Sequence, residues 1–108
     1  MQFEDIKKEV KEIVFDKLRM DCDNQFEAVI LKEELAKLIA RLEKFFGSPV
    51  WPSKNSLSFQ IRELIEGFGG IVSGQILYFS KEGSDTIFAM LWPWQDGERT
   101  TLKIIKKI

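Results

Sequence analysis

Segment 85–94, DTIFAMLWPW, is the sequence feature that most constrains the fold, because it is apolar on both faces of a strand. Alternate residues of a strand point to opposite sides of its sheet. Ile87, Ala89 and Leu91 are then expected on one face, and a row of large side chains on the other. Both faces need shielding from water, which requires helices around the sheet or association with another molecule. The row of large side chains consists of Phe88, Met90, Trp92 and Trp94.

Two further apolar runs flank this segment and predict a three-stranded antiparallel meander with 85–94 as its central strand. IVSGQILYFS precedes the segment and is followed by KEGS, a turn candidate. ERTTLKIIKKI follows the dipeptide Asp96-Gly97, which is a strong hairpin signal. The last run carries the positive charges that protect an edge strand from pairing with another chain. These charges belong to Lys103, Lys106 and Lys107.

Three helices are predicted before the sheet, over residues 3–20, 24–46 and 56–68. Apolar residues recur in each segment at three- and four-residue steps, which is the period of one helix face. Asn24, with a glutamate three residues later, is expected to cap the second helix. The run FEAVIL at 26–31 is ambiguous, since periodicity does not distinguish a short buried strand from a helix.

The sequence therefore predicts one α+β domain over residues 1–108: three helices followed by a three-stranded antiparallel meander, with a helical part at 1–68 and a sheet at 69–108. A chain of 108 residues has the length of one domain, and 44% hydrophobic with 31% charged residues is a globular composition. Cys22 is the only cysteine, which excludes an internal disulfide and suits a reducing compartment. With no apolar run long enough to cross a bilayer and a charged N-terminus, we expect a cytoplasmic protein without membrane contact.

Most catalytic chemistry is disfavoured by composition. There are no histidines, which removes the usual general base near neutral pH and the commonest metal ligand. One cysteine cannot build a zinc site, and it lies between Asp21 and Asp23, which disfavours its thiolate. GFGG at 67–70 follows a predicted helix, whereas a dinucleotide-binding fingerprint follows a strand. We therefore expect no enzyme activity, no cofactor and no metal.

The leading functional hypothesis is a non-catalytic module for protein interaction or homo-oligomerisation, with a protein partner or a second copy in a homodimer. Packing in the core, against the helices, is the commoner role for a row of large side chains, and partner contact is the second role. Trp51 lies in a loop between prolines, where it either plugs the core or forms a surface anchor. The candidate contact residues are Trp92, Trp94, Trp51 and Phe88.

Two alternatives remain open. Three helices before a hairpin resembles the winged-helix topology of DNA-binding domains, but the third helix has only Arg62 as a cation beside Glu63 and Glu66. A major-groove reader is expected to be more basic, so nucleic-acid binding is less favoured. A small apolar ligand between helices and sheet is the other alternative. The nucleic-acid candidates are Arg62, Lys103, Lys106 and Lys107.

Overall fold

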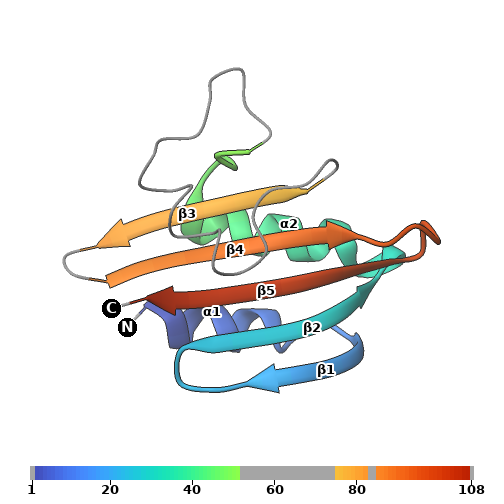
Figure 1. The fold of residues 1–108 in the computed structure, drawn as a ribbon, viewed down its shortest axis with the longest axis horizontal. Helices are drawn as coiled ribbons and strands as arrows, with labels where there is room; N and C mark the ends of the chain where they lie inside the picture. The colour runs from blue at the N-terminus through green and yellow to red at the C-terminus, as the bar shows by residue number, and fades with distance from the viewer. Residues whose placement is uncertain (1, 52–74, 83–84, 108) are drawn as a thin grey trace.

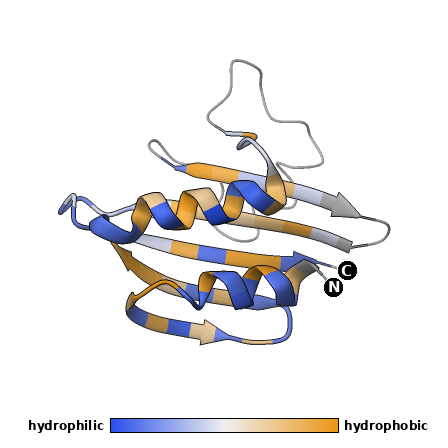
Figure 2. Cartoon of the chain, turned by 180° about the vertical axis from the view of Figure 1, so that it is seen from behind, coloured by the Kyte–Doolittle hydropathy of each residue, from blue (hydrophilic) through white to orange (hydrophobic). Residues whose placement is uncertain are grey.

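The computed structural model describes residues 2–51, 75–82 and 85–107. Their strands form a single antiparallel sheet in the order β1-β2-β5-β4-β3, and both described helices lie across the same face of it (Figures 1 and 2). The elements are α1 (Gln2–Val10), β1 (Phe15–Asp21), β2 (Gln25–Leu31), α2 (Lys32–Phe46), β3 (Ile76–Glu82), β4 (Asp85–Pro93) and β5 (Arg99–Lys107).

The predicted fold of three helices and a three-stranded meander is wrong. The described residues form two helices and a five-stranded sheet, in which β3, β4 and β5 do follow one another as a meander. The two additional strands, β1 and β2, come from the part of the chain that was expected to be helical. The predicted third helix, 56–68, lies outside the described residues.

The first predicted helix, 3–20, ends at Val10, and its second half is strand β1. The stripe that predicts a helix loses its period there, because Phe15 and Leu18 lie off it. Phe15 instead pairs across the strands with Ile30 and packs against the ring of Phe26, with ring centroids 5.8 Å apart. A cross-strand contact of this kind stabilises a sheet, and it joins residues too far apart in sequence to meet on one helix.

The ambiguous run 26–31 belongs to strand β2, so the second helix begins only at Lys32. Phe26, Ala28 and Ile30 point toward the helices and join the main core, which is the two-residue period of a strand. Asn24 does not cap a helix; its backbone oxygen accepts a hydrogen bond from the backbone N–H of Lys106 at 2.9 Å. Pairing with β1 and β5 on both sides satisfies the backbone of β2 and overrides the helical spacing.

Strand β5 lies at the centre of the sheet, between β2 and β4, and the expectation of an edge strand is wrong. Leu102 and Ile104 point into the main core, while Lys103 lies on the opposite face beside Glu27 of β2. A central strand can carry a lysine where its side chain reaches water and a carboxylate beyond the sheet surface. The charges at the end of the chain therefore do not mark an edge.

Strand β4 is buried on both faces, which confirms the prediction from segment 85–94. Ile87, Ala89 and Leu91 face the helices and join the main core with Leu38 and Leu42 of α2. The larger side chains lie on the opposite face, so they do not pack against the two described helices, contrary to the expectation from the sequence. They form a second cluster, consisting of Leu77, Phe88, Met90 and Ile105, with Val50, Trp51, Phe79 and Trp92 packed against it.

The turn between β4 and β5 confirms the hairpin signal at Asp96-Gly97. Gly97 has a φ of +70°, a region that favours glycine over residues with a side chain. The backbone N–H of Trp94 donates to the carbonyl of Arg99 at 2.8 Å, which extends the hairpin ladder one step beyond β4. This turn places Trp94 at the end of the sheet, beside the start of β5.

Candidate interaction surface around Trp92 and Trp94

Two tryptophans and three cations gather on the sheet face opposite α1 and α2, and we call this group the tryptophan surface. Trp92 is near the end of β4, and its backbone position is opposite Thr101 of the central strand. Both tryptophan side chains are half-buried. The strands that supply them are rigidly paired, so the rings have defined positions. The tryptophan surface consists of Trp92, Trp94, Arg19, Arg99 and Lys103.

Trp94 is held by a hydrogen bond and by two arginines. Its indole Nε1–H donates to the Thr101 hydroxyl at 2.8 Å. The guanidinium carbons of Arg19 and Arg99 each lie 5.7 Å from its ring centroid, within the range of a cation–π interaction. The hydrogen bond fixes the orientation of the ring, and the ring in turn positions both arginines.

Trp92 contacts apolar side chains of the sheet and also lies beside a lysine. It packs against the second cluster, which contains Phe88 and Met90 of its own strand. The Nζ of Lys103 lies 5.0 Å from its ring centroid. Part of a large apolar ring thus remains at the surface beside a positive charge.

Glu27 joins two of these cations through long ion pairs. Its Oε2 lies 3.5 Å from the Nη1 of Arg19, and its Oε1 lies 3.8 Å from the Nζ of Lys103. Charge-assisted hydrogen bonds between such groups are typically about 2.7–2.9 Å. Glu27 therefore neutralises the pair only loosely, and both cations keep N–H donors for another acceptor.

Arg99 is bound more tightly, because it closes the turn that carries Trp94. Its guanidinium donates to Asp16 at 3.0 Å and to Asp96 at 2.8 Å. These two carboxylates raise the pKa of Arg99. Asp96 also accepts the backbone N–H groups of Glu98 and Arg99, and these bonds, with the arginine charge, lower the pKa of Asp96. Arg99 is thus mainly a structural clamp on the β4–β5 turn.

The other two predicted contact residues lie apart from this surface. Phe88 is fully buried in the second cluster and offers no surface to a partner. Trp51 is half-buried against the same cluster and is joined to Leu77 of β3 by a short antiparallel bridge. The Leu77 N–H donates to the Trp51 carbonyl at 3.0 Å, which positions Trp51 beside β3, the strand at the opposite edge from β1.

The predicted nucleic-acid residues do not form one surface in the described structure. Lys103 and Lys106 lie on opposite faces of the sheet, because their positions in β5 differ by an odd number. Lys107 is exposed at the far end of the same strand, and Arg62 lies outside the described residues. The winged-helix resemblance also loses its basis, because two of the expected helical segments contain strands β1 and β2.

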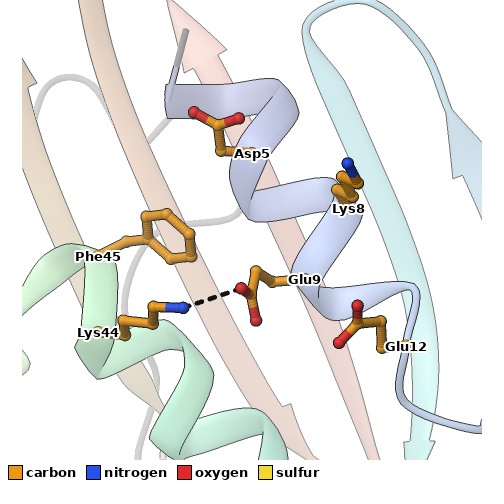
Figure 3. A pocket seen from close by; sticks show the side chains of 6 residues that line it. All are labelled: Asp5, Lys8, Glu9, Glu12, Lys44 and Phe45. Carbon is orange, nitrogen blue, oxygen red and sulfur yellow. Dashed lines mark hydrogen bonds and ion pairs between the residues drawn. The ribbon is translucent and has the colours of Figure 1, made fainter.

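A groove between α1 and α2 bears on the apolar-ligand alternative (Figure 3). Its volume is about 330 Å³, and among the described residues that line it Phe45 alone is apolar. Glu9 accepts a hydrogen bond from Lys44 at 2.9 Å and another from Arg41 at 2.7 Å, and these cations lower its pKa. Such a charged groove does not suit an apolar ligand. The lining residues are Asp5, Lys8, Glu9, Glu12, Lys44 and Phe45.

Comparisons with known protein families, with curated proteins and with solved structures find no match to this chain. Within residues 2–51, 75–82 and 85–107, no helix has the length and apolarity needed to cross a bilayer. In the same residues, no three acidic or cysteine side chains gather closely enough to hold a metal ion.

Sequence reasoning anticipated the tryptophan pair but missed Arg19, Glu27 and Arg99. Arg19 was assigned to the first helix and Glu27 to a helix cap, which placed them on different elements. Their contact depends on the pairing of β1 with β2, where Met20 lies opposite Glu27 and Arg19 is an extra residue at a bulge. The one available signal was the ambiguity of segment 26–31, since a strand there brings Glu27 to the face opposite Ala28.

Proposed function

We propose that the protein is a non-catalytic protein-interaction module and that the tryptophan surface is its contact site. One observation carries this proposal: Trp92 and Trp94 remain partly exposed on the sheet face opposite α1 and α2, with cations held over their rings. Tryptophan and arginine are the side chains most enriched among residues that dominate binding energy at protein interfaces. The partner is either another protein or a second copy of this chain.

The fixed geometry of the tryptophan surface supports the proposal. Binding is weakened by the entropy lost when mobile side chains become ordered. Trp94 is already anchored to Thr101, and Arg19 and Arg99 already lie over its ring. A surface ordered before contact has less of this cost. Met20 adds a flexible apolar side chain on the same face, opposite Glu27.

Photo-cross-linking from β1 tests the proposal, because neighbouring positions of this strand lie on different faces. Met20 is 38% exposed on the face of the tryptophan surface, and Leu18 is 50% exposed on the helix side, opposite Ala28. A photoreactive amino acid at position 20, activated in the producing cells, is expected to give a protein adduct. The same residue at position 18 is the control and is expected to give little adduct.

A second comparison connects the adduct to the tryptophans. Trp94→Ala in the position-20 variant is expected to remove most of the adduct, while circular dichroism confirms that the sheet persists. An adduct of twice the chain mass identifies a second copy as the partner. Equal yields from positions 18 and 20, or no adduct from position 20, would show that this surface is not an interaction site.

A further inference from the structure

We infer that the tryptophan surface recognises an acidic segment of its protein partner, whose carboxylates bind Arg19 and Lys103 while an apolar side chain covers the rings of Trp92 and Trp94. This inference rests on the proposed function and adds the chemistry of the partner. It is carried by the charge of the sheet face, by the loose pairing of Glu27, and by the cations over the rings.

Among the residues that the structure describes on β1, β2, β5 and the β4–β5 turn, the formal charge of this face differs in sign from that of the whole chain. The chain has a formal net charge of −1. Residues paired across antiparallel strands point to the same side, and on β1, β2 and β5 most of the charged side chains that share the face of the tryptophan surface are basic. On the described parts of β1, β2, β5 and the β4–β5 turn, the cations of this face are Lys17, Arg19, Arg99, Lys103 and Lys107, and the carboxylates that contact them are Asp16, Glu27 and Asp96.

The space between Arg19 and Lys103 has the properties of a carboxylate site. Glu27 reaches both cations, but at 3.5 and 3.8 Å, whereas Arg41 binds Glu9 at 2.7 Å elsewhere in the chain. A guanidinium has five N–H donors and an ammonium group has three, so each can donate a hydrogen bond to a second carboxylate. Glu27 shows that an anion fits between these two cations, and it also competes with any anion that the partner supplies.

The cations over the rings favour an acidic peptide over single-stranded nucleic acid. Bases bind to such surfaces by stacking on open aromatic faces. In this structure Lys103 lies over Trp92, and two arginines lie over Trp94. A base would have to displace them, whereas a carboxylate binds to them where they are. The parts of the rings that stay exposed are then available to one apolar side chain of the partner.

Titration of the full chain with synthetic peptides tests the inference. The probe is a peptide with one phenylalanine between runs of glutamate, and its counterpart has glutamine in place of glutamate. Indole N–H signals in two-dimensional NMR spectra report binding, with the signals of Trp92 and Trp94 assigned from single Trp→Phe variants. At low salt, the glutamate peptide is expected to shift both signals, and the glutamine peptide is expected to bind at least about tenfold more weakly.

Charge variants locate the binding. Arg19→Gln and Lys103→Gln are each expected to weaken binding of the glutamate peptide by about tenfold, because each loses a charge-assisted contact. Glu27→Gln removes the internal competitor and is expected to strengthen binding. Lys37→Gln is the matched control, since it removes an exposed charge from α2 on the other side of the sheet. It is expected to change the affinity less than twofold, because surface charges beyond a Debye length are screened.

Several outcomes would overturn the inference. They are no shift with the glutamate peptide, equal affinity for the glutamine peptide, or an equal effect of Lys37→Gln and Arg19→Gln. Tighter binding of oligothymidylate would identify a nucleic acid, and a dimer in sedimentation that Arg19→Gln dissociates would identify a second copy. If cross-linking from position 20 succeeds but the glutamate and glutamine peptides bind with equal affinity, the proposed function stands and the inference of an acidic partner is refuted.

Discussion

Replacement of the buried lysine on α1 by methionine, Lys7→Met, is expected to loosen the attachment of this helix to the sheet. Lys7 is only 6% exposed. Its Nζ donates to the Asp21 carboxylate at 2.8 Å and to the Cys22 carbonyl at 2.9 Å, with Glu4 at 3.7 Å. It thereby joins α1 to the end of β1 and the turn that follows. Methionine keeps most of the aliphatic stem and removes the donors.

The expected loss is about 2 kcal/mol of unfolding free energy, from the hydrogen-bond values of about 1.5–3 kcal/mol for a charged group. The lower part of the range applies because the Asp21 side chain is 29% exposed and keeps a second ion pair, to Lys11 at 2.6 Å. We do not expect a smaller loss of unfolding free energy, because Lys7→Met also removes the hydrogen bond to the Cys22 carbonyl. Removing the partner of a more deeply buried carboxylate would cost about 3–5 kcal/mol.

The cost is expected to depend on pH, and the sign follows from the pKa shifts. Hydrogen bonds from Lys11 and Lys7 lower the pKa of Asp21. Burial alone would lower the pKa of Lys7, but its bonds to Asp21 and Glu4 raise it. The Asp21 contribution is therefore present above the ordinary carboxyl pKa of about 4 and is lost as the pH falls through the depressed value. The Lys7 contribution is present below the ordinary lysine pKa and is lost only in strong alkali.

Urea unfolding followed by tryptophan fluorescence measures the effect at neutral pH and near pH 3. Lys8→Met is the control, since Lys8 is exposed on the same helix and its replacement is expected to change stability by less than about 0.5 kcal/mol. The cost of Lys7→Met is expected to shrink as the pH falls toward the depressed pKa of Asp21, because the carboxylate then begins to be protonated. Equal costs for the two variants, or a cost that does not change with pH, would refute the reasoning.

Three further predictions address a tyrosine, a turn and the core. Burial and the carboxylate of Glu43, 3.3 Å from its hydroxyl, raise the pKa of Tyr78 to about 12. As it is the only tyrosine, near-ultraviolet absorbance should titrate close to that pH, with stability falling from about pH 10 upward, and a midpoint near 10 would contradict its burial. Gly97→Ala should cost about 1 kcal/mol in urea unfolding, because φ is positive although a Cβ meets open space, and Gly97→Asn should cost less. Leu42→Ala, in the main core, should cost about 2–5 kcal/mol, whereas Leu18→Ala on the exposed edge strand should cost less than about 1 kcal/mol; similar values would refute the assignment of the core.

The sequence predicted those features that depend on local chemistry. Ala89 lies in a strand buried on both sides, as the two-sided apolar pattern requires. Gly97 occupies a tight hairpin turn, as the Asp96-Gly97 signal predicts, and α2 ends at residue 46, where the predicted second helix ends. Each feature is determined by residues close together in the chain, so a pattern within a short window is sufficient.

The sequence did not predict the arrangement of the strands. Strand β1 is polar and mostly exposed, so it has no alternation of buried and exposed residues to distinguish it from a solvated helix. The central place of β5 depends on pairing with β2, in which Ala28 lies opposite Leu102. Such a contact joins distant parts of the chain and leaves no short-range signal.

The candidate site was predicted only in part, for the same reason. Trp92 and Trp94 share a face because of their spacing within one strand, which the sequence shows directly. Arg19 reaches Trp94 only because β1 and β2 fold back against β5. A bulge in β1 also contributes, since it adds Arg19 opposite Glu27, and sequence alone does not predict where a bulge forms.

The position of β5 has a consequence for the order of events during synthesis. Within the described residues, the hairpins β1–β2 and β3–β4 do not pair with each other, and β5 (residues 99–107) is the strand that joins them. A ribosome that has released only the first four strands therefore holds two half-sheets, each with an open side. Closure must wait for β5, which inserts between two strands separated by about half of the chain, so we expect folding to be limited by this insertion.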